Sequence, residues 1–282
     1  MKKFLKLLVV AVLSITTVFG LTACGNDDII VQTNAFFAPF EYYDGKEIVG
    51  VDVDIMNMVG ERLDRNVVFK DGDFGIIIDT VSDGKLADVG AAGLTITPDR
   101  AEKVDFSIPY YTAVQYVMFL ATDAADFPVQ TAADGTQYVL WSTLGGKDIG
   151  VQTDTTGNIY VEGEINKDDG FDGVLQGTGA EVHPYTDANL ASNAIGQNID
   201  CVVIDELPAK YMTENNDGKF ICAAFYYDAE TATEEQYAIC VKKGNDKLLD
   251  AINEVLQELI DDVQDGQNGI DRLVAKHFGL ED

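Results

Sequence analysis

The sequence predicts an α/β fold. Short apolar runs that suit strands alternate with segments that suit helices along most of the chain, as in a mainly parallel sheet covered by helices. The chain has 282 residues, of which 46% are hydrophobic, so it can bury a sizeable core. A run rich in Tyr, Val, Phe and Leu at 110–121 leads from a first α/β set to a second, and the chain returns at 236–241. Because the chain passes twice between the two sets, we expect a hinged pair of lobes. The pattern of strands and helices alone does not distinguish two lobes from one larger α/β domain.

The first α/β set is expected to begin with a strand at Ile29–Thr33. A helix is expected at Val51–Leu63, because its apolar positions share one helical face. These positions are Val53, Met56, Val59, Gly60 and Leu63. Residues 87–90 are expected to form a strand that leads into the turn before Arg100.

The second set is expected to begin with a strand at 147–152 and to include another at 200–204. After the chain returns, a helix is expected at 248–263, because apolar residues recur at a spacing of three or four. These residues are Leu249, Ile252, Leu256, Leu259 and Val263. An amphipathic segment at 269–278 closes the chain, and no internal repeat is evident.

The charge of the chain is strongly negative. It has 19 basic and 48 acidic residues, which give a formal net charge of −29 at pH 7. Such a field disfavours nucleic acid and anionic lipid head groups as partners. His183 and His277 are isolated and no residues have metal-ligand spacing, so we expect no metal and no cofactor.

The N-terminus has the features of a secretory signal. Three lysines at positions 2, 3 and 6 precede an apolar run at 7–19, which is too short to span a bilayer comfortably. The sequence Leu-Thr-Ala-Cys at 21–24 resembles a lipobox, at which cleavage leaves Cys24 as a lipidated N-terminus. We expect several acyl chains on Cys24 to anchor the protein on the membrane surface, where one chain would bind only reversibly.

Three further cysteines lie in apolar, strand-like runs. They are Cys201, Cys222 and Cys240, so at most two can pair. Secretion permits a disulfide, but the odd number and the core-like settings favour three buried thiols.

Arg100 is the first candidate for ligand binding. Its guanidinium offers a planar fork of donors that matches a carboxylate. The preceding turn at 92–97 can add the backbone N–H groups of Ala92 and Gly93 and the hydroxyl of Thr95. By residue type alone, Arg100 also suits a solvated position in the first turn of a helix that begins near Thr97.

The segment around Arg100, AGLTITPDRAEKVDFSIPYY at 92–111, resembles the signature region of extracellular solute-binding proteins of polar amino acid ABC importers. Other blocks follow the order of that family, among them DFGIIIDTVSDGKLADVGAAG at 73–93, GKDIGVQTDTTGN at 146–158 and EQYAICVKKGN at 235–245. The resemblance implies a type II periplasmic-binding-protein-like fold, with two α/β lobes joined by a two-stranded hinge. The expected divisions are 1–23 for the signal peptide, 24–28 for the tether, 29–112 with 234–282 for lobe 1, and 113–233 for lobe 2.

An enclosed amino acid needs a partner for each of its two charges. Asp205 ends the apolar run at 201–204, where a carboxylate at a sheet's carboxyl edge faces the crevice. The resemblance assigns this position to the ligand ammonium, and the alternative is an N-cap for the helix that follows. Thr155 and Thr156 lie in a strand-to-helix turn that suits an anion, so they could share the carboxylate with Arg100 when the lobes close. Simple capping of the helix by Asp154 or Thr155 is compatible with this role.

The side-chain end of the ligand is assigned from the resemblance. Phe37 and Phe74 match stacking positions, although each would otherwise suit the core. Asn34 and Gln152 fall where related proteins read the ligand side chain, and an acid is frequent at the Asn34 position. Two neutral amides offer no compensating charge, so we expect a neutral polar L-amino acid.

The leading interpretation is therefore a lipid-anchored, monomeric receptor that passes an amino acid to ABC permease subunits and is not an enzyme. One alternative is a periplasmic dehydratase on the same fold, for which Asp154, His183 and Glu206 supply acids or bases but no constellation. Another is a sensory amino-acid-binding protein. Such a protein is normally joined to a membrane-spanning helix, and no apolar stretch after residue 19 is long enough.

Overall fold

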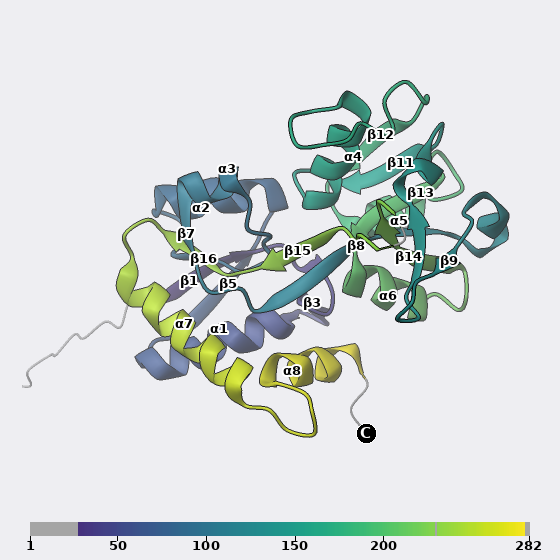
Figure 1. The fold of residues 1–282 in the computed structure, drawn as a ribbon. Helices are drawn as coiled ribbons and strands as arrows, with labels where there is room; N and C mark the ends of the chain where they lie inside the picture. Colours follow the sequence, from purple (N-terminus) through teal and green to yellow (C-terminus); the bar gives the residue numbers. More distant parts are fainter. Residues whose placement is uncertain (1–27, 229, 280–282) are drawn as a thin grey trace, which may run out of the picture.

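The computed structural model describes residues 28–228 and 230–279. Two α/β lobes lie side by side and are joined by two neighbouring strands, the long β8 (Tyr111–Leu120) and the short β15 (Glu234–Tyr237) (Figure 1). The expected signal peptide and the lipidation site Cys24 lie outside the described residues.

The first lobe contains a five-stranded sheet, a three-stranded sheet and six helices. The five strands, in sheet order, are β5 (Val67–Asp71), β1 (Ile29–Thr33), β6 (Val89–Gly90), β16 (Cys240–Lys242) and β7 (Val104–Phe106). The smaller sheet has β2 (Phe36–Phe37), β3 (Glu41–Asp44) and β4 (Glu47–Val49). The helices are α1 (Val51–Leu63), η1 (Phe74–Ile76), α2 (Ile77–Asp83), α3 (Pro98–Lys103), α7 (Asp246–Asp261) and α8 (Gly269–Phe278).

The second lobe is built on one large sheet that includes β8. Its other strands, in sheet order around β8, are β12 (Glu181–Tyr185), β11 (Asp148–Gln152), β13 (Cys201–Asp205), β14 (Phe220–Tyr226), β10 (Gln137–Leu140) and β9 (Gln130–Thr131). Its helices are η2 (Ala121–Asp126), η3 (Trp141–Leu144), α4 (Thr156–Asn166), α5 (Ala188–Ala194) and α6 (Glu206–Glu214).

The two large sheets repeat one topology. In the first, β1 lies between the parallel strands β5 and β6, and β16 runs antiparallel between β6 and β7. In the second, β11 lies between the parallel strands β12 and β13, and β8 runs antiparallel between β13 and β14. The lobes thus share a strand plan, although the sequence shows no repeat.

The hinge is an antiparallel pair. Tyr237 lies opposite Tyr111 and Glu234 lies opposite Val114, so each strand carries side chains at the junction of the lobes. Beyond the pair, β8 continues into the second sheet, and the chain after β15 enters the first sheet as β16. The residues chosen as lobe boundaries stay a prediction.

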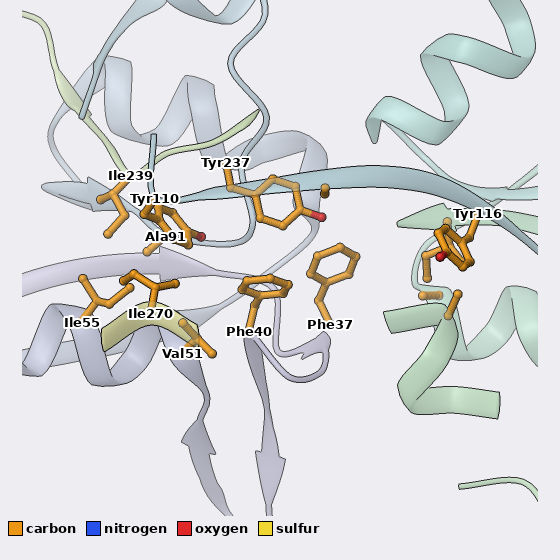
Figure 2. Close-up of a cluster of buried hydrophobic side chains, with 14 of the residues drawn as sticks. Phe37, Phe40, Val51, Ile55, Ala91, Tyr110, Tyr116, Tyr237, Ile239 and Ile270 are labelled. Atoms are coloured by element: carbon orange, nitrogen blue, oxygen red, sulfur yellow. The ribbon is translucent and has the colours of Figure 1, made fainter. Parts of the chain in front are cut away.

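Aromatic side chains fill the first lobe at its hinge end. Figure 2 shows the rings of Phe37, Phe40, Tyr110 and Tyr237 gathered there. The Phe40 and Tyr237 centroids are 5.0 Å apart in an edge-on contact, and both side chains are fully buried. In the second lobe the buried Trp141 stacks on Phe225 with centroids 4.3 Å apart. Each lobe therefore has its own packed core beside the cleft.

The helix predictions are largely confirmed. On α1, Val53, Met56, Val59 and Gly60 are buried as expected. The expected extent of α7 is wrong, because the helix ends at Asp261 and Val263 is 61% exposed.

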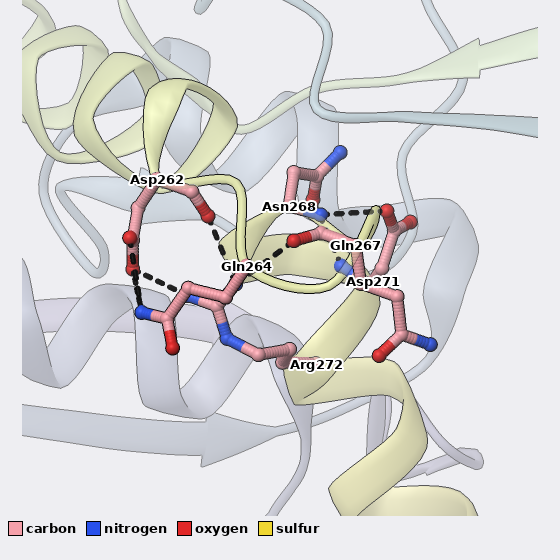
Figure 3. A network of polar contacts seen from close by, with 6 residues as sticks. All are labelled: Asp262, Gln264, Gln267, Asn268, Asp271 and Arg272. Carbon is pink, nitrogen blue, oxygen red and sulfur yellow. Dashed lines mark hydrogen bonds and ion pairs between the residues drawn. The ribbon is translucent and has the colours of Figure 1, made fainter.

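The turn that follows α7 is held by polar contacts (Figure 3). Asp262 forms an ion pair with Arg272, and the Gln264 N–H donates to the Gln267 carbonyl at 2.8 Å. Asn268 begins α8 with a capping box that is completed by Asp271. These contacts connect α7 to α8 in a fixed turn.

The cysteines and histidines are structural. Cys201, Cys222 and Cys240 are all free thiols, as expected, although Cys222 is only half-buried. His277 Nε2 lies 2.9 Å from an oxygen of Asp54, and His183 Nε2 lies 2.7 Å from Asp148. Both histidines lie outside the cleft between the lobes.

Candidate functional site

A pocket lies where the two lobes meet beside the hinge. It has an empty volume of about 460 Å³, part of which is open to solvent. Of the eleven residues expected to bind ligand, all but Ala92 and Arg100 line it. The lining residues are Asn34, Phe37, Phe74, Gly93, Thr95, Gln152, Thr155, Thr156, Ala188, Val202, Val203, Ile204 and Asp205.

Arg100 lies next to this pocket and connects the lobes. Thr97 caps α3 by accepting from the Arg100 N–H at 3.3 Å, so the local helix start holds the residue in place. Its side chain is not solvated: Nη1 donates to the Thr95 carbonyl and Nη2 to the Asp154 carbonyl, each at 2.9 Å. The guanidinium carbon also lies 5.3 Å from the centre of the Phe74 ring.

Burial lowers the pKa of Arg100, and the nearby carboxyl groups of Glu235 and Asp205 oppose that effect. The side chain is only 9% exposed, and both of its hydrogen-bond acceptors, the Thr95 carbonyl in its own lobe and the Asp154 carbonyl across the cleft, are neutral. A carboxylate that entered here would give the guanidinium a charged partner, which forms stronger hydrogen bonds than a carbonyl does.

The expectation that Ala92 and Gly93 present backbone donors to a ligand is corrected. Ala92 packs in a core cluster and does not line the pocket. Gly93 does line it, but its N–H donates to Asp52 at 3.0 Å. Gly93 has φ +54°, and a Cβ there would lie 2.8 Å from the Phe37 ring. Only glycine fits this turn without strain.

The two threonines of the second lobe have different roles. Thr155 caps α4: its oxygen accepts from the Asn158 N–H at 3.3 Å, and its hydroxyl donates to the Gln152 carbonyl at 2.7 Å. Thr156 reaches across the cleft, and its hydroxyl donates to the hydroxyl oxygen of Thr95 at 2.8 Å. The capping alternative therefore describes Thr155, while Thr156 contacts the first lobe.

Asp205 ends β13 and points into the junction of the lobes. It occupies the N-cap position of α6 but makes no side-chain cap, so the capping alternative is wrong. Its two oxygens accept from Gln115 Nε2 and from the Tyr237 hydroxyl, two residues of the hinge strands. Burial, followed by the charge of Glu235, raises the pKa of Asp205 well above its ordinary value.

Glu235 is a second acid beside the pocket that the sequence reasoning missed. It is 6% exposed, and its carboxylate accepts from the Thr95 hydroxyl and from Gln115 Nε2. Burial raises its pKa, and those hydrogen bonds reduce the effect. The available signal was its spacing of two residues from Tyr237, because in a strand such residues lie on the same face, and in β15 both are buried.

The two amides at the other end of the pocket meet across the lobes. Gln152 Nε2 donates to Asn34 Oδ1 at 2.9 Å, and Asn34 Nδ2 donates to the Gly72 carbonyl at 2.9 Å. Phe37 and Phe74 both line the pocket as expected. The contact between the lobes at this end of the pocket is therefore made by neutral groups.

One group of side chains in the described part of the chain has the reach to hold a metal ion, where the sequence indicated none. Asp148, Glu181 and His183 place ligand atoms within 4.8 Å of one another on the outer strands β11 and β12. All three are at least partly solvent-exposed and lie away from the pocket. In this structure His183 Nε2 and an oxygen of Asp148 form a surface hydrogen bond.

Two lobes on a two-stranded hinge, with a buried cation and buried acids around an interlobe pocket, define a protein that closes over a small charged solute. The sequence of residues 29–279 matches the family model of the bacterial extracellular solute-binding proteins, family 3, and the chain belongs to that family. It is thereby a binding protein and not an enzyme. None of the helices in the described residues is long and apolar enough to cross a membrane.

The relatives include amino-acid-binding proteins. The arginine-binding extracellular protein ArtP of Bacillus subtilis (strain 168) is 38% identical over 122 residues, which cover 40% of this chain and 46% of ArtP. A probable histidine-binding protein of Neisseria gonorrhoeae is 25% identical over 253 residues, 89% of this chain and 83% of that protein. An ancestral arginine-binding protein, solved bound to glutamine, has a TM-score of 0.69 and 30% identity, covering 89% of this chain and 98% of its own.

Proposed function

We propose that this protein binds an L-amino acid in the interlobe pocket and delivers it to the permease of an ABC importer. The carrying observation is the placement of opposite charges beside one pocket: Arg100 on the first lobe, and Asp205 with its acidic neighbour Glu235 at the hinge. An amino acid presents an anionic and a cationic group on one carbon, so this arrangement can satisfy both inside a dry cleft. The amino acids in the names of the relatives support the same class of ligand.

In this proposal the ligand carboxylate binds Arg100 and takes the place of the Asp154 carbonyl as partner of Nη2. The ligand ammonium binds Asp205, whose oxygens already face the junction of the lobes. Thr95 and Thr156 close over the same end from opposite lobes. Binding and closure are coupled, because the ligand satisfies groups from both lobes at once.

We infer that the side chain of the ligand is neutral and polar. Asn34 and Gln152 offer an amide donor and amide acceptors there, and no acidic side chain lines that end of the pocket. The ancestral protein bound to glutamine supports a ligand of this type. The competing candidate is arginine, which is supported by the names of the relatives and by the excess of acid over base beside the pocket.

The proposal also includes a lipid anchor at Cys24 and a monomeric receptor on the outer face of the cell membrane. The support is the signal-like segment and the lipobox-like sequence at 21–24. When lysates of cells that express the protein are partitioned between a detergent phase and an aqueous phase, the wild type should enter the detergent phase. The Cys24→Ala variant should move to the aqueous phase, and equal partition of both would overturn the anchor.

The ligand is tested with a thermal-shift panel of the twenty L-amino acids, followed by calorimetry of those that stabilise the protein. We expect glutamine or another neutral polar amino acid to give the largest shift, and arginine to be at least tenfold weaker. A stronger shift with arginine would overturn the side-chain assignment. No shift with any amino acid would overturn the function.

A further inference from the structure

Two buried carboxyl groups lie at the hinge end of the pocket, whereas an amino acid has one ammonium. Asp205 lines the pocket, and Glu235 lies beside it. Asp205 and Glu235 face a single amide of Gln115, and the Nε2 atom donates to one oxygen of each acid. Both acids are 6% exposed, and Gln115 is fully buried. The other amide atom, Gln115 Oε1, is buried without a hydrogen-bond partner. One neutral amide therefore bridges two acids that water scarcely reaches.

Charged and titratable groups from several elements surround this acid pair. Glu41 on β3 and Tyr111 on β8 lie close enough for the charge of Asp205 to raise the pKa of each. Arg100 on α3 favours ionisation of both acids, but its guanidinium donates to backbone carbonyls. Tyr237 on β15 donates to Asp205, and Tyr160 on α4 lies close enough for its pKa to be raised by both acids.

The hydroxyls of Thr95 and Thr156 complete the shell. Thr156 donates to Thr95, and Thr95 donates to Glu235. Within the described residues, Arg100 is thus the cation that acts on both acids. Two carboxylates bridged by one donor repel each other, and burial adds to the cost of ionising both.

Burial and mutual repulsion raise the pKa of each acid of the pair. Two interacting acids titrate as a unit, so a proton that either one holds belongs to the pair. A bound ammonium would supply the positive charge that the pair lacks. It would also offer three N–H donors, whereas the protonated pair has a single carboxyl O–H.

We propose that Glu235 is a positioning residue of the ammonium subsite, and that the Asp205–Glu235 pair holds one proton without ligand and releases it when an amino acid binds. This inference rests on the proposed function. The carboxyl O–H bond breaks, the proton leaves to solvent, and the ligand ammonium takes its place beside the two carboxylates. Affinity should therefore rise with pH until the free pair has lost its proton.

The test is calorimetry with L-glutamine and L-arginine between pH 5.5 and 8, each in two buffers of different ionisation enthalpy. The dependence of the observed enthalpy on the buffer counts the protons released. We expect roughly one proton per ligand for the wild type in the pH range where the free pair is protonated. The Glu235→Gln variant should release fewer protons, because loss of the Glu235 charge lowers the pKa of Asp205 and leaves burial as the main cause that raises it.

The matched control is Glu234→Gln, which removes the same charge from the neighbouring, exposed position of the strand and should leave the proton count unchanged. A second measurement needs no variant. Glutaramate, which is glutamine without its α-ammonium, should release no proton from the wild type.

The possible outcomes separate this inference from the proposed function. If amino acids bind and the wild type and Glu235→Gln release the same number of protons, the inference alone is overturned. The same holds if amino acids bind and no proton is released at any pH. Release of a proton by glutaramate also overturns it, since the ammonium would not be the cause. Failure of all twenty amino acids to bind overturns the proposed function, and the proton linkage with it.

Discussion

A second buried acid pair, inside the first lobe, gives a prediction about stability and pH. Glu41 on β3 and Asp52 in the first turn of α1 are each 1% exposed. Asp52 accepts from the Tyr110 hydroxyl at 2.5 Å and from the Gly93 N–H at 3.0 Å. Both oxygens of Glu41 lack a hydrogen-bond donor. The pair is therefore difficult to ionise inside the fold.

The magnitude follows from Asp52. Burial raises its pKa from the ordinary 3.8 to about 6, although the bonds from Tyr110 and Gly93 act in the opposite direction. The folded state thus keeps a proton that the unfolded chain loses near pH 4. The contribution of this proton to the free energy of unfolding is fully present below the unfolded pKa of 3.8 and is lost as the pH rises through 6. The total loss is about 3 kcal/mol. Burial and the charge of Asp52 also raise the pKa of Glu41, so this loss is a lower bound.

The measurement is the free energy of unfolding in urea at several pH values from 4 to 7.5. We compare the wild type with a Glu41→Gln, Asp52→Asn double variant, which has no titrating group at these positions. The stability of the wild type relative to this variant should fall by about 2 kcal/mol or more between pH 4 and 7, because at pH 4 the unfolded chain has already lost part of its protons.

The matched control for this prediction is Asp44→Asn, Glu47→Gln. These two exposed acids lie opposite each other on the same hairpin, so the same charges are removed outside the core. The control should show no such pH-dependent difference from the wild type. A difference between the wild type and the Glu41, Asp52 variant that stays constant within about 1 kcal/mol would refute the reasoning, because the buried pair would then titrate as it does in the unfolded chain.

Three predictions concern the ligand. Arg100→Ala should weaken binding of the preferred amino acid by about 2–5 kcal/mol, since it removes a buried charge partner; calorimetry that gives wild-type affinity would exclude Arg100 as the carboxylate partner. Asp205→Asn should weaken binding of amino acids strongly but of their deaminated analogues little, and equal losses in a competition assay would indicate a structural role. Asn34→Asp should shift preference toward lysine and arginine by roughly tenfold or more, or about 1.4 kcal/mol, and an unchanged ranking would place Asn34 away from the ligand side chain.

The alternation of strands and helices predicted the α/β class, and the family resemblance supplied the two lobes. Residues at the ends of strands and in the turns after them, such as Gln152 and Asp205, could be placed from sequence because such positions gather at one edge of a sheet. The use of the Gly93 N–H could not be predicted. It depends on Asp52, which lies 41 residues away and reaches Gly93 only in the folded lobe.

Glu235 was missed for a different reason. The expected return of the chain at 236–241 begins one residue after it, whereas β15 begins at Glu234 and turns Glu235 inward. The local sequence also predicted the same carboxylate-binding role for Thr155 and Thr156. In the structure Thr155 caps α4, and Thr156 contacts Thr95 across the cleft. Charge and hydroxyl patterns identify candidates, but the direction of each side chain depends on packing.

The hinge strands have a consequence for binding kinetics. Gln115 on β8 and Glu235 on β15 lie on the two strands that join the lobes, so we expect an opening of the lobes to displace them least. The contact between Asn34 and Gln152, by contrast, joins opposite lobes and exists only on closure. A ligand can therefore first bind at the hinge end of the pocket, where the acids are already in place. The contact between Asn34 and Gln152 then forms and retains it. Changes at the hinge strands should act mainly on the association rate, and changes at the cross-lobe contact mainly on the residence time.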